Sequence, residues 1–109
     1  MNDISWNCRG LGRPRAVLEL TKMVKKHSPW FVFLMETRAK DKFLKNLYRK
    51  LNLKNLFIVP RNNTGGGLAL YWKEGLNLKV QSSSPSHIDA VVDPGVDDAW
   101  RLPVSTEIQ

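Results

Sequence analysis

Two apolar runs, each ended by a polar side chain, constrain the fold of this chain more than any other feature. Residues 3–7 are typical of a buried strand ending at Asn7, and the apolar run 30–35 is followed directly by Glu36. Between them, residues 14–27 carry apolar side chains at helical spacing, which predicts an amphipathic helix. A strand, a helix and a strand in this order predict a right-handed parallel pair. The carboxyl ends of such strands meet at one sheet edge, so we expect an amide and a carboxylate side by side there.

The rest of the chain predicts one more helix and a series of strands. We expect the helix at about 39–51, a polar turn at 82–86, and strands at 56–59, 68–72, 76–80, 88–92 and from about 99. Pro103 would confine the last strand to a sheet edge or end it early. The predicted class is α/β, with a β-α-β-α start followed by antiparallel strands in one mixed sheet that has helices on one face. We expect that nothing left in the sequence can cover the other face.

Charge is divided unevenly along the 109 residues. Residues 1–61 hold 14 Lys or Arg against 4 Asp or Glu, a net charge of +10, whereas residues 62–109 hold 3 against 6, a net charge of −3. A basic half favours a polyanionic partner such as DNA. Two lysine-rich helix faces that only contact water would give the same pattern.

The single cysteine, Cys8, excludes a disulfide within the chain and fits a reducing compartment. No segment has the length and apolar content of a membrane span, so we expect no membrane partner. The first residues do not form a secretory signal. We therefore expect an intracellular protein, with the nucleus as one candidate compartment; the pattern does not predict an oligomeric state.

Glu36 is the strongest candidate functional residue. A carboxylate directly after a buried strand needs a cation or hydrogen-bond donors, because leaving it unpaired is costly. Mg²⁺ is one such cation, since it takes oxygen ligands and often uses only one or two carboxylates. A salt bridge to Arg38 or Arg9 is the structural alternative. Asn7 would either orient a ligand or this carboxylate, or cap the backbone at the strand end.

Two glycine-rich segments invite a phosphate-binding interpretation. Gly10–Gly12 lies between a predicted strand and a predicted helix, but the third glycine of a dinucleotide fingerprint is replaced by Arg15. Gly65–Gly67 precedes a strand and therefore lacks a helix N-terminus. A turn that needs a free backbone explains the second segment better.

The remaining reactive side chains have mainly structural interpretations. Cys8 is expected to pack as a small apolar residue. His27 is placed on the apolar side of its helix. His87 and Asp89 fall on one face of a predicted strand, which is compatible with a His–Asp pair although no further signal supports catalysis.

Four segments together resemble the endonuclease/exonuclease/phosphatase superfamily, which has a DNase I-like fold. They are residues 4–12 (ISWNCRGLG), 32–37 (VFLMET), 66–73 (GGLALYWK) and 87–92 (HIDAVV). Within it, the chain is most similar to the apurinic-type endonuclease domain at the N-terminus of plant LINE-type (non-LTR) retrotransposon polyproteins. The likeness runs from about Asp3 to Arg101 and lies in the order and spacing of all four segments.

The resemblance implies a four-layer α/β sandwich and Mg²⁺-dependent hydrolysis of DNA phosphodiesters. It implies that Asn7 is an active-site residue and that Glu36 is the metal ligand. Arg9 stands where many apurinic endonucleases have an Asp, which removes a second ligand there. Arg9, Arg13, Arg38 and Lys40 are the candidate DNA contacts, and Gly66 and Gly67 match a family turn without a catalytic role.

The family's later motifs, which are a Tyr on a following strand, Asp-x-Asn and Ser-Asp-His, do not occur in this sequence. We therefore expect residues 1–104 to be the first half of the domain, residues 105–109 to be a divergent tail, and the fragment to be inactive alone. A non-catalytic nucleic-acid-binding module and a non-functional pseudogene product are the alternatives. Other chemistries of the superfamily, such as phosphoinositide or sphingomyelin cleavage, stay open because their specificity loops belong to the later half.

Overall fold

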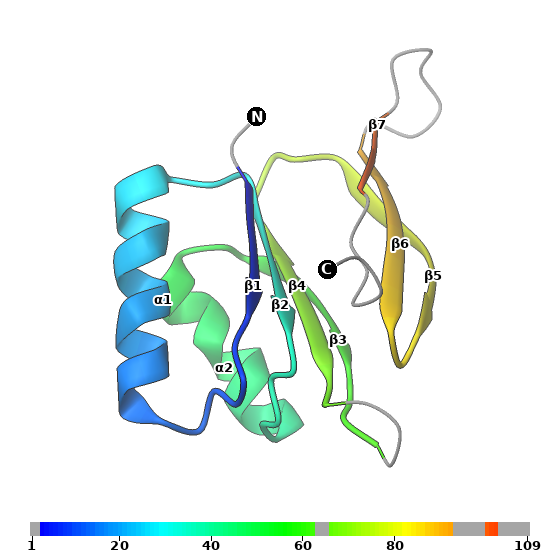
Figure 1. Cartoon of the computed structure of the whole chain (residues 1–109). Coiled ribbons are helices and arrows are strands. Elements are labelled where there is room, and N and C mark those ends of the chain that lie inside the picture. The colour runs from blue at the N-terminus through cyan, green and yellow to red at the C-terminus, as the bar shows by residue number, and fades with distance from the viewer. Residues whose placement is uncertain (1–2, 63–65, 93–99, 103–109) are drawn as a thin grey trace.

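A computed structural model describes residues 3–62, 66–92 and 100–102 of the chain (Figure 1). Its elements in chain order are β1 (Asp3–Asn7), α1 (Pro14–His27), β2 (Phe31–Met35), α2 (Asp41–Leu51), β3 (Asn55–Val59), β4 (Leu68–Trp72), β5 (Leu78–Ser84), β6 (His87–Val92) and β7 (Trp100–Leu102). Within the described residues, neither helix has the length and apolar character needed to cross a membrane. The expected boundary at residue 104 and the tail 105–109 lie outside the described residues.

The first sheet has the strand order β1-β2-β4-β3. β1 and β2 are parallel, as predicted, and their register pairs Asn7 with Met35, so Glu36 directly follows the partner of Asn7. β4 runs antiparallel to both β2 and β3, which agrees with the antiparallel strands predicted after the second helix. The mixed α/β class is therefore confirmed, and the two polar side chains lie at one end of this sheet.

Helices α1 and α2 cover one face of the first sheet (Figure 1). α1 begins with a proline at its first turn and ends at Ser28, which adopts a left-handed conformation and donates its N–H to the Val24 carbonyl. α2 ends in the same way, with left-handed Asn52 donating to the Tyr48 carbonyl. The helical spacing of the apolar residues puts one face of each helix on the sheet: Ala16, Leu20 and Val24 from α1, and Leu44, Leu47 and Leu51 from α2.

Tyr71 ties the sheet to α2 through a buried hydrogen bond. Its ring is fully buried in β4, and its hydroxyl donates to the Leu44 carbonyl over 2.7 Å. Burial raises the pKa of this phenol above its ordinary value, because the charged form would lose its hydration.

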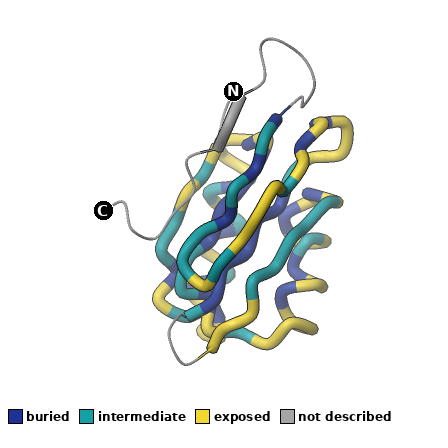
Figure 2. The backbone as a smooth tube through the Cα atoms, turned by 90° about the vertical axis from the view of Figure 1, so that its right-hand side faces the viewer, coloured by how far each residue is buried: buried dark blue, intermediate teal, exposed yellow. Residues whose placement is uncertain are grey.

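The other face of the first sheet is covered by a second sheet, so the expectation that nothing could cover it is wrong. β5, β6 and β7 form a separate antiparallel sheet in this order, and it lies against the first sheet on the side opposite the helices (Figure 1). The buried residues of this interface are Phe31, Phe33, Leu68, Leu70, Leu76, Leu78, Ile88, Ala90 and Val92. Figure 2 shows buried residues gathered inside the molecule and exposed ones on its outer surface. The described fold therefore has three layers, helix, sheet and sheet.

The polar segment 82–86 is also not the turn that was predicted. Ser82, Ser83 and Ser84 belong to β5, which pairs with β6 through Ser84 and His87, and only two residues connect the strands. β5 lies at an edge of its sheet, where an exposed face tolerates serines. A register shift between Val80 and Ser82 interrupts the alternation that the sequence pattern relied on.

Smaller differences concern single positions. The predicted strands at residues 30 and 76 begin later, at Phe31 and Leu78, and the second helix begins at Asp41. His27 is exposed rather than turned to the apolar side, because it sits in the last turn of α1 beyond the covered face. Trp30 lies outside the sheet interface, and the Lys73 Nζ stands 4.6 Å from its ring centroid.

Candidate functional site

Asn7 and Glu36 meet at the carboxyl ends of β1 and β2. The Asn7 side-chain Nδ2 donates a hydrogen bond to the Glu36 carboxylate at Oε2. The Asn7 Oδ1 in turn accepts from the Arg9 backbone N–H over 3.2 Å. Asn7 therefore orients the carboxylate and also ties down the loop after β1, so both interpretations made from the sequence describe what this side chain does.

Backbone hydrogen bonds hold the segment 36–38 on one side against the loop that follows β1. The Gly10 N–H donates to the Glu36 carbonyl over 2.8 Å, and the Leu11 N–H donates to the Thr37 carbonyl over 2.8 Å. These bonds extend the β1–β2 pairing beyond both strand ends. Glu36 is therefore fixed by main-chain pairing and not only by its side-chain contacts.

The glycines that precede β4 hold segment 36–38 from the other side. The Thr37 N–H donates to the Gly67 carbonyl over 3.2 Å, and the Arg38 N–H donates to the Gly66 carbonyl over 2.7 Å. A Cβ on Gly66 would lie 3.1 Å from the Glu36 Cα. The turn interpretation from the sequence missed this role, because the contact joins segments 30 residues apart and leaves no local signal.

Backbone strain is concentrated around the carboxylate. Glu36 has φ 50, Arg38 has φ 45 and Arg9 has φ 50, all in the left-handed region. A residue with a side chain pays about 1–2 kcal/mol for this conformation, so it persists only where the surrounding contacts impose it. Three such residues around one carboxylate are typical of a functional site.

Arg38 forms an ion pair with the second carboxylate oxygen of Glu36. The Arg38 Nη2 lies 2.9 Å from the Glu36 Oε1, and the two side chains are 57% and 35% exposed. The salt-bridge alternative is thus confirmed with Arg38 as the partner. An exposed pair of this kind is worth about 0–1 kcal/mol, so the arginine can leave at little cost.

The site offers oxygen ligands for a hard cation but few of them. In the described part of the chain, no group of three or more His, Cys, Asp or Glu side chains could hold a metal. Mg²⁺ is commonly bound through one or two carboxylates, with waters and substrate phosphates as the other ligands. The half-exposed Glu36 carboxylate fits this kind of site, whereas it would not suit an ion that needs a full protein cage.

Cys8 is structural, as predicted. The thiol lies in the core with an exposed fraction of 2%. Burial raises its pKa to about 12, and the Glu36 charge adds to the rise. A thiol with this pKa stays protonated at neutral pH and is not a nucleophile.

The other residues that the sequence predicted for the site lie on different elements and do not form one cluster with Glu36. Arg13 precedes α1 and its Nη2 lies 3.4 Å from the Cys8 carbonyl, close to the end of β1. Lys40 precedes α2, and in the described residues it makes no hydrogen bond or ion pair with Glu36. His87 begins β6, with its Nδ1 2.5 Å from the Ser84 Oγ across the tight hairpin.

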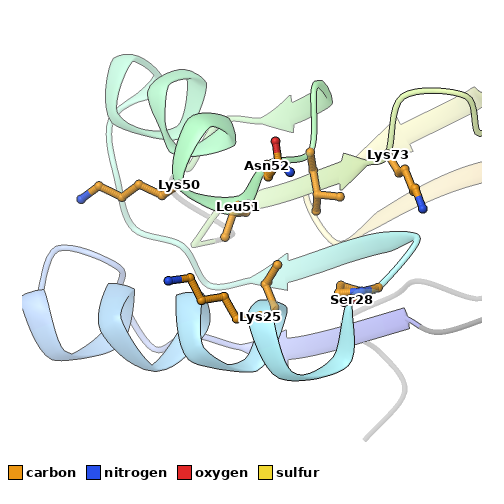
Figure 3. Close-up of a pocket in the computed structure, with 9 residues that line it drawn as sticks. Lys25, Ser28, Lys50, Leu51, Asn52 and Lys73 are labelled. Carbon is orange, nitrogen blue, oxygen red and sulfur yellow. The ribbon is translucent and has the colours of Figure 1, made fainter.

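A hollow of about 460 Å³ lies at the opposite end of the first sheet, beside the C-termini of α1 and α2 (Figure 3). Figure 3 shows Lys25 and Lys50 extending toward one side of it and Lys73 at the other end. The C-termini of helices carry partial negative charge, which lysines offset and which disfavours a bound anion. This hollow contains none of the residues that the sequence predicted for the site.

Comparison with known proteins agrees with this geometry. The model of the endonuclease/exonuclease/phosphatase family matches residues 4–107. No curated protein matches the chain closely enough to count as a relative. The family match spans both the Asn7–Glu36 pair and the second sheet, so it covers the site as well as the fold. The chain belongs to the endonuclease/exonuclease/phosphatase family.

Proposed function

We propose that this chain carries the first part of the active site of a Mg²⁺-dependent DNA endonuclease. The observation that carries the proposal is the hydrogen bond from Asn7 to Glu36 at the ends of two parallel strands, in a chain of the nuclease and phosphatase family. Asn7 holds the carboxylate in place, and Glu36 would hold the cation. When bound, Mg²⁺ would offset the negative charge that develops on the phosphate as water attacks.

The proposed substrate is DNA of the kind that a LINE-type retrotransposon nicks. The support is the resemblance of the four segments described above, together with the positive charge near the site. Arg9, Arg38 and Lys40 are exposed, with Arg38 in segment 36–38 itself, and Arg13 is exposed directly before α1. In this proposal they contact backbone phosphates, which gives affinity that falls with salt.

We further propose that the 109-residue chain alone does not cut DNA at a useful rate. The resemblance implies a general base and further acidic ligands, and their motifs are absent from this sequence. Loss of such groups costs several powers of ten in rate. Supercoiled plasmid incubated with the chain and Mg²⁺ should therefore stay supercoiled. Nicking that disappears in Glu36→Gln and in EDTA would contradict this expectation.

The metal-binding part of the proposal has its own prediction. Replacing Arg38 with Gln should tighten Mg²⁺ binding by up to about fivefold, because an exposed ion pair of about 1 kcal/mol no longer competes for Glu36. Titration calorimetry of the purified chain measures this. Lys79→Gln removes one exposed positive charge from β5 and is the matched control. Equal affinities in the Arg38→Gln and Lys79→Gln variants would show that Arg38 does not compete for the carboxylate. Unchanged affinity in Glu36→Gln would exclude Glu36 as the ligand.

DNA binding without cleavage is the second candidate function. The basic side of the molecule favours it, since α1 and α2 together carry eight Lys or Arg and two Asp or Glu, a net charge of +6. This function needs neither Glu36 nor Mg²⁺. Duplex DNA that binds the Glu36→Gln variant as tightly as the unchanged chain, with strong dependence on salt, is its expected signature.

A further inference from the structure

A groove on the outer side of the helical layer has an apolar floor. Its volume is about 420 Å³, and it is lined by residues from the loop before α1 (Leu11, Gly12, Arg13), from α1 (Pro14, Val17, Leu18, Thr21) and from α2 (Phe43, Lys50). Two of these side chains are unusually exposed for their type, Leu18 at 55% and Phe43 at 38%. The groove lies on helix surface that the first sheet does not cover.

The exposed leucine is not explained by the packing of α1. That helix buries Ala16, Leu20 and Val24 against the sheet, and Leu18 lies about 200° around the helix from Leu20. An amphipathic helix normally places polar residues at such positions. Leu18 is therefore more than half exposed and belongs to neither buried cluster of the described fold.

The Thr21 hydroxyl, a polar group within the groove, already has hydrogen-bond partners. The Thr21 hydroxyl donates to the carbonyls of Val17 and Leu18 in its own helix. It therefore needs no partner from a ligand, and the groove can receive apolar side chains without leaving this hydroxyl unpaired. Apolar contacts in the middle of the groove would then add to affinity rather than cost it.

The rim of the groove is positively charged, whereas its floor is apolar. Arg13 and Lys50 line it and are exposed. Lys50 belongs to α2, one of the two helices whose combined net charge is +6, and Arg13 directly precedes α1. An apolar strip between cations complements a segment that has apolar residues along one side and carboxylates flanking them.

We propose that this groove docks an acidic amphipathic helix of a partner protein. One or two large apolar side chains of that helix would pack on Leu18 and Phe43, and its carboxylates would face Arg13 and Lys50. This is the helix-in-groove mode, in which residues at positions i, i+3, i+4 and i+7 enter an apolar groove. DNA is the less suitable occupant, because phosphates gain nothing from an exposed leucine. The groove shares Arg13 with the proposed DNA contacts but includes neither Asn7 nor Glu36, and the proposal does not depend on the nuclease function.

The test uses the full 109-residue chain and a fluorescein-labelled synthetic helix of about 18 residues, or five turns. This peptide has Leu and Phe at i, i+3, i+4 and i+7 spacing and mostly Glu elsewhere. A scrambled peptide keeps its charge and composition but loses the periodicity, and a duplex oligonucleotide represents nucleic acid. Fluorescence anisotropy should show that the periodic peptide binds at least about tenfold more tightly than the scrambled one.

Substitutions then locate the binding surface. Leu18→Ser combined with Phe43→Ser should weaken binding of the periodic peptide by at least about tenfold, since apolar anchors dominate such interfaces. Trp30→Ser is the matched control, because Trp30 has the same exposed fraction as Phe43, 38%, but lies outside the groove. Arg13→Gln combined with Lys50→Gln should weaken binding and reduce its dependence on salt. Circular dichroism melts verify that each variant is folded.

Three results would overturn the proposal. The first is equal affinity for the periodic and scrambled peptides, which would leave only nonspecific charge attraction. The second is unchanged affinity for the periodic peptide in the folded Leu18→Ser, Phe43→Ser variant, which would mean that the peptide does not bind in the groove. The third is no detectable binding of either peptide by a folded chain.

Discussion

Replacing Phe33 with alanine should lower the free energy of unfolding by about 3–5 kcal/mol, the usual cost of deleting a buried phenylalanine ring. Phe33 is fully buried at the centre of β2, in register with Leu70 of β4, and belongs to the cluster between the two sheets. A chain of this size is stable by roughly 5–15 kcal/mol, so the variant should lose a large part of its stability.

Urea denaturation followed by circular dichroism measures this loss. Leu18→Ala is the control, because Leu18 is 55% exposed and its truncation should change stability by no more than about 0.5 kcal/mol. A cost below about 1 kcal/mol for Phe33→Ala would mean that the second sheet does not pack on the first. The same experiment therefore tests whether residues 78–92 cover the sheet face that the sequence pattern left bare.

Replacing Gly67 with alanine should destabilise the protein by about 2–4 kcal/mol, from a disfavoured φ and from overpacking together. Gly67 has φ +97, and an added Cβ would lie 2.8 Å from the Thr37 Oγ1 and 3.2 Å from the Arg61 backbone nitrogen. The Thr37 side chain is buried, and its Oγ1 has no hydrogen-bond partner in the described part of the structure, so it has little room to move.

Two other glycines separate the causes of this effect. Gly75 has nearly the same φ, +96, but no atom lies within 4 Å of an added Cβ, so Gly75→Ala should cost only the conformational part, about 1–2 kcal/mol. Gly12 has open space and no positive φ, so Gly12→Ala should be nearly neutral. Equal costs at Gly67 and Gly75 would show that the contact with segment 36–38 contributes nothing.

The Gly67→Ala substitution should also affect the candidate metal site at Glu36. The Gly67 carbonyl accepts from the Thr37 N–H, directly after Glu36 in the chain. Displacing this backbone should turn the Glu36 carboxylate away from Asn7. We therefore expect weaker Mg²⁺ binding in Gly67→Ala than in Gly75→Ala, measured by the calorimetry described above.

Local patterns in the sequence were sufficient for the first half of the fold. Residues 14–27 repeat apolar side chains at the helical period, and Phe31–Met35 is uniformly apolar, so a helix between two parallel strands was the consistent solution. The parallel orientation of the two strands then placed their carboxyl ends at one end of the sheet. For this reason the proximity of Asn7 and Glu36 was predictable without any knowledge of the rest of the chain.

Only the tertiary structure shows that β5, β6 and β7 form a separate sheet and which face of the first sheet they cover. Alternation in β5 and β6 shows that each strand buries one face, but not which sheet it joins or what it covers. The contacts of Gly66 and Gly67 with segment 36–38 likewise join residues that no periodicity relates. The sequence by itself determined the elements of the site and their order. Packing between distant segments determined the second sheet and the backbone strain at Glu36, because such contacts form only when both partners are already folded.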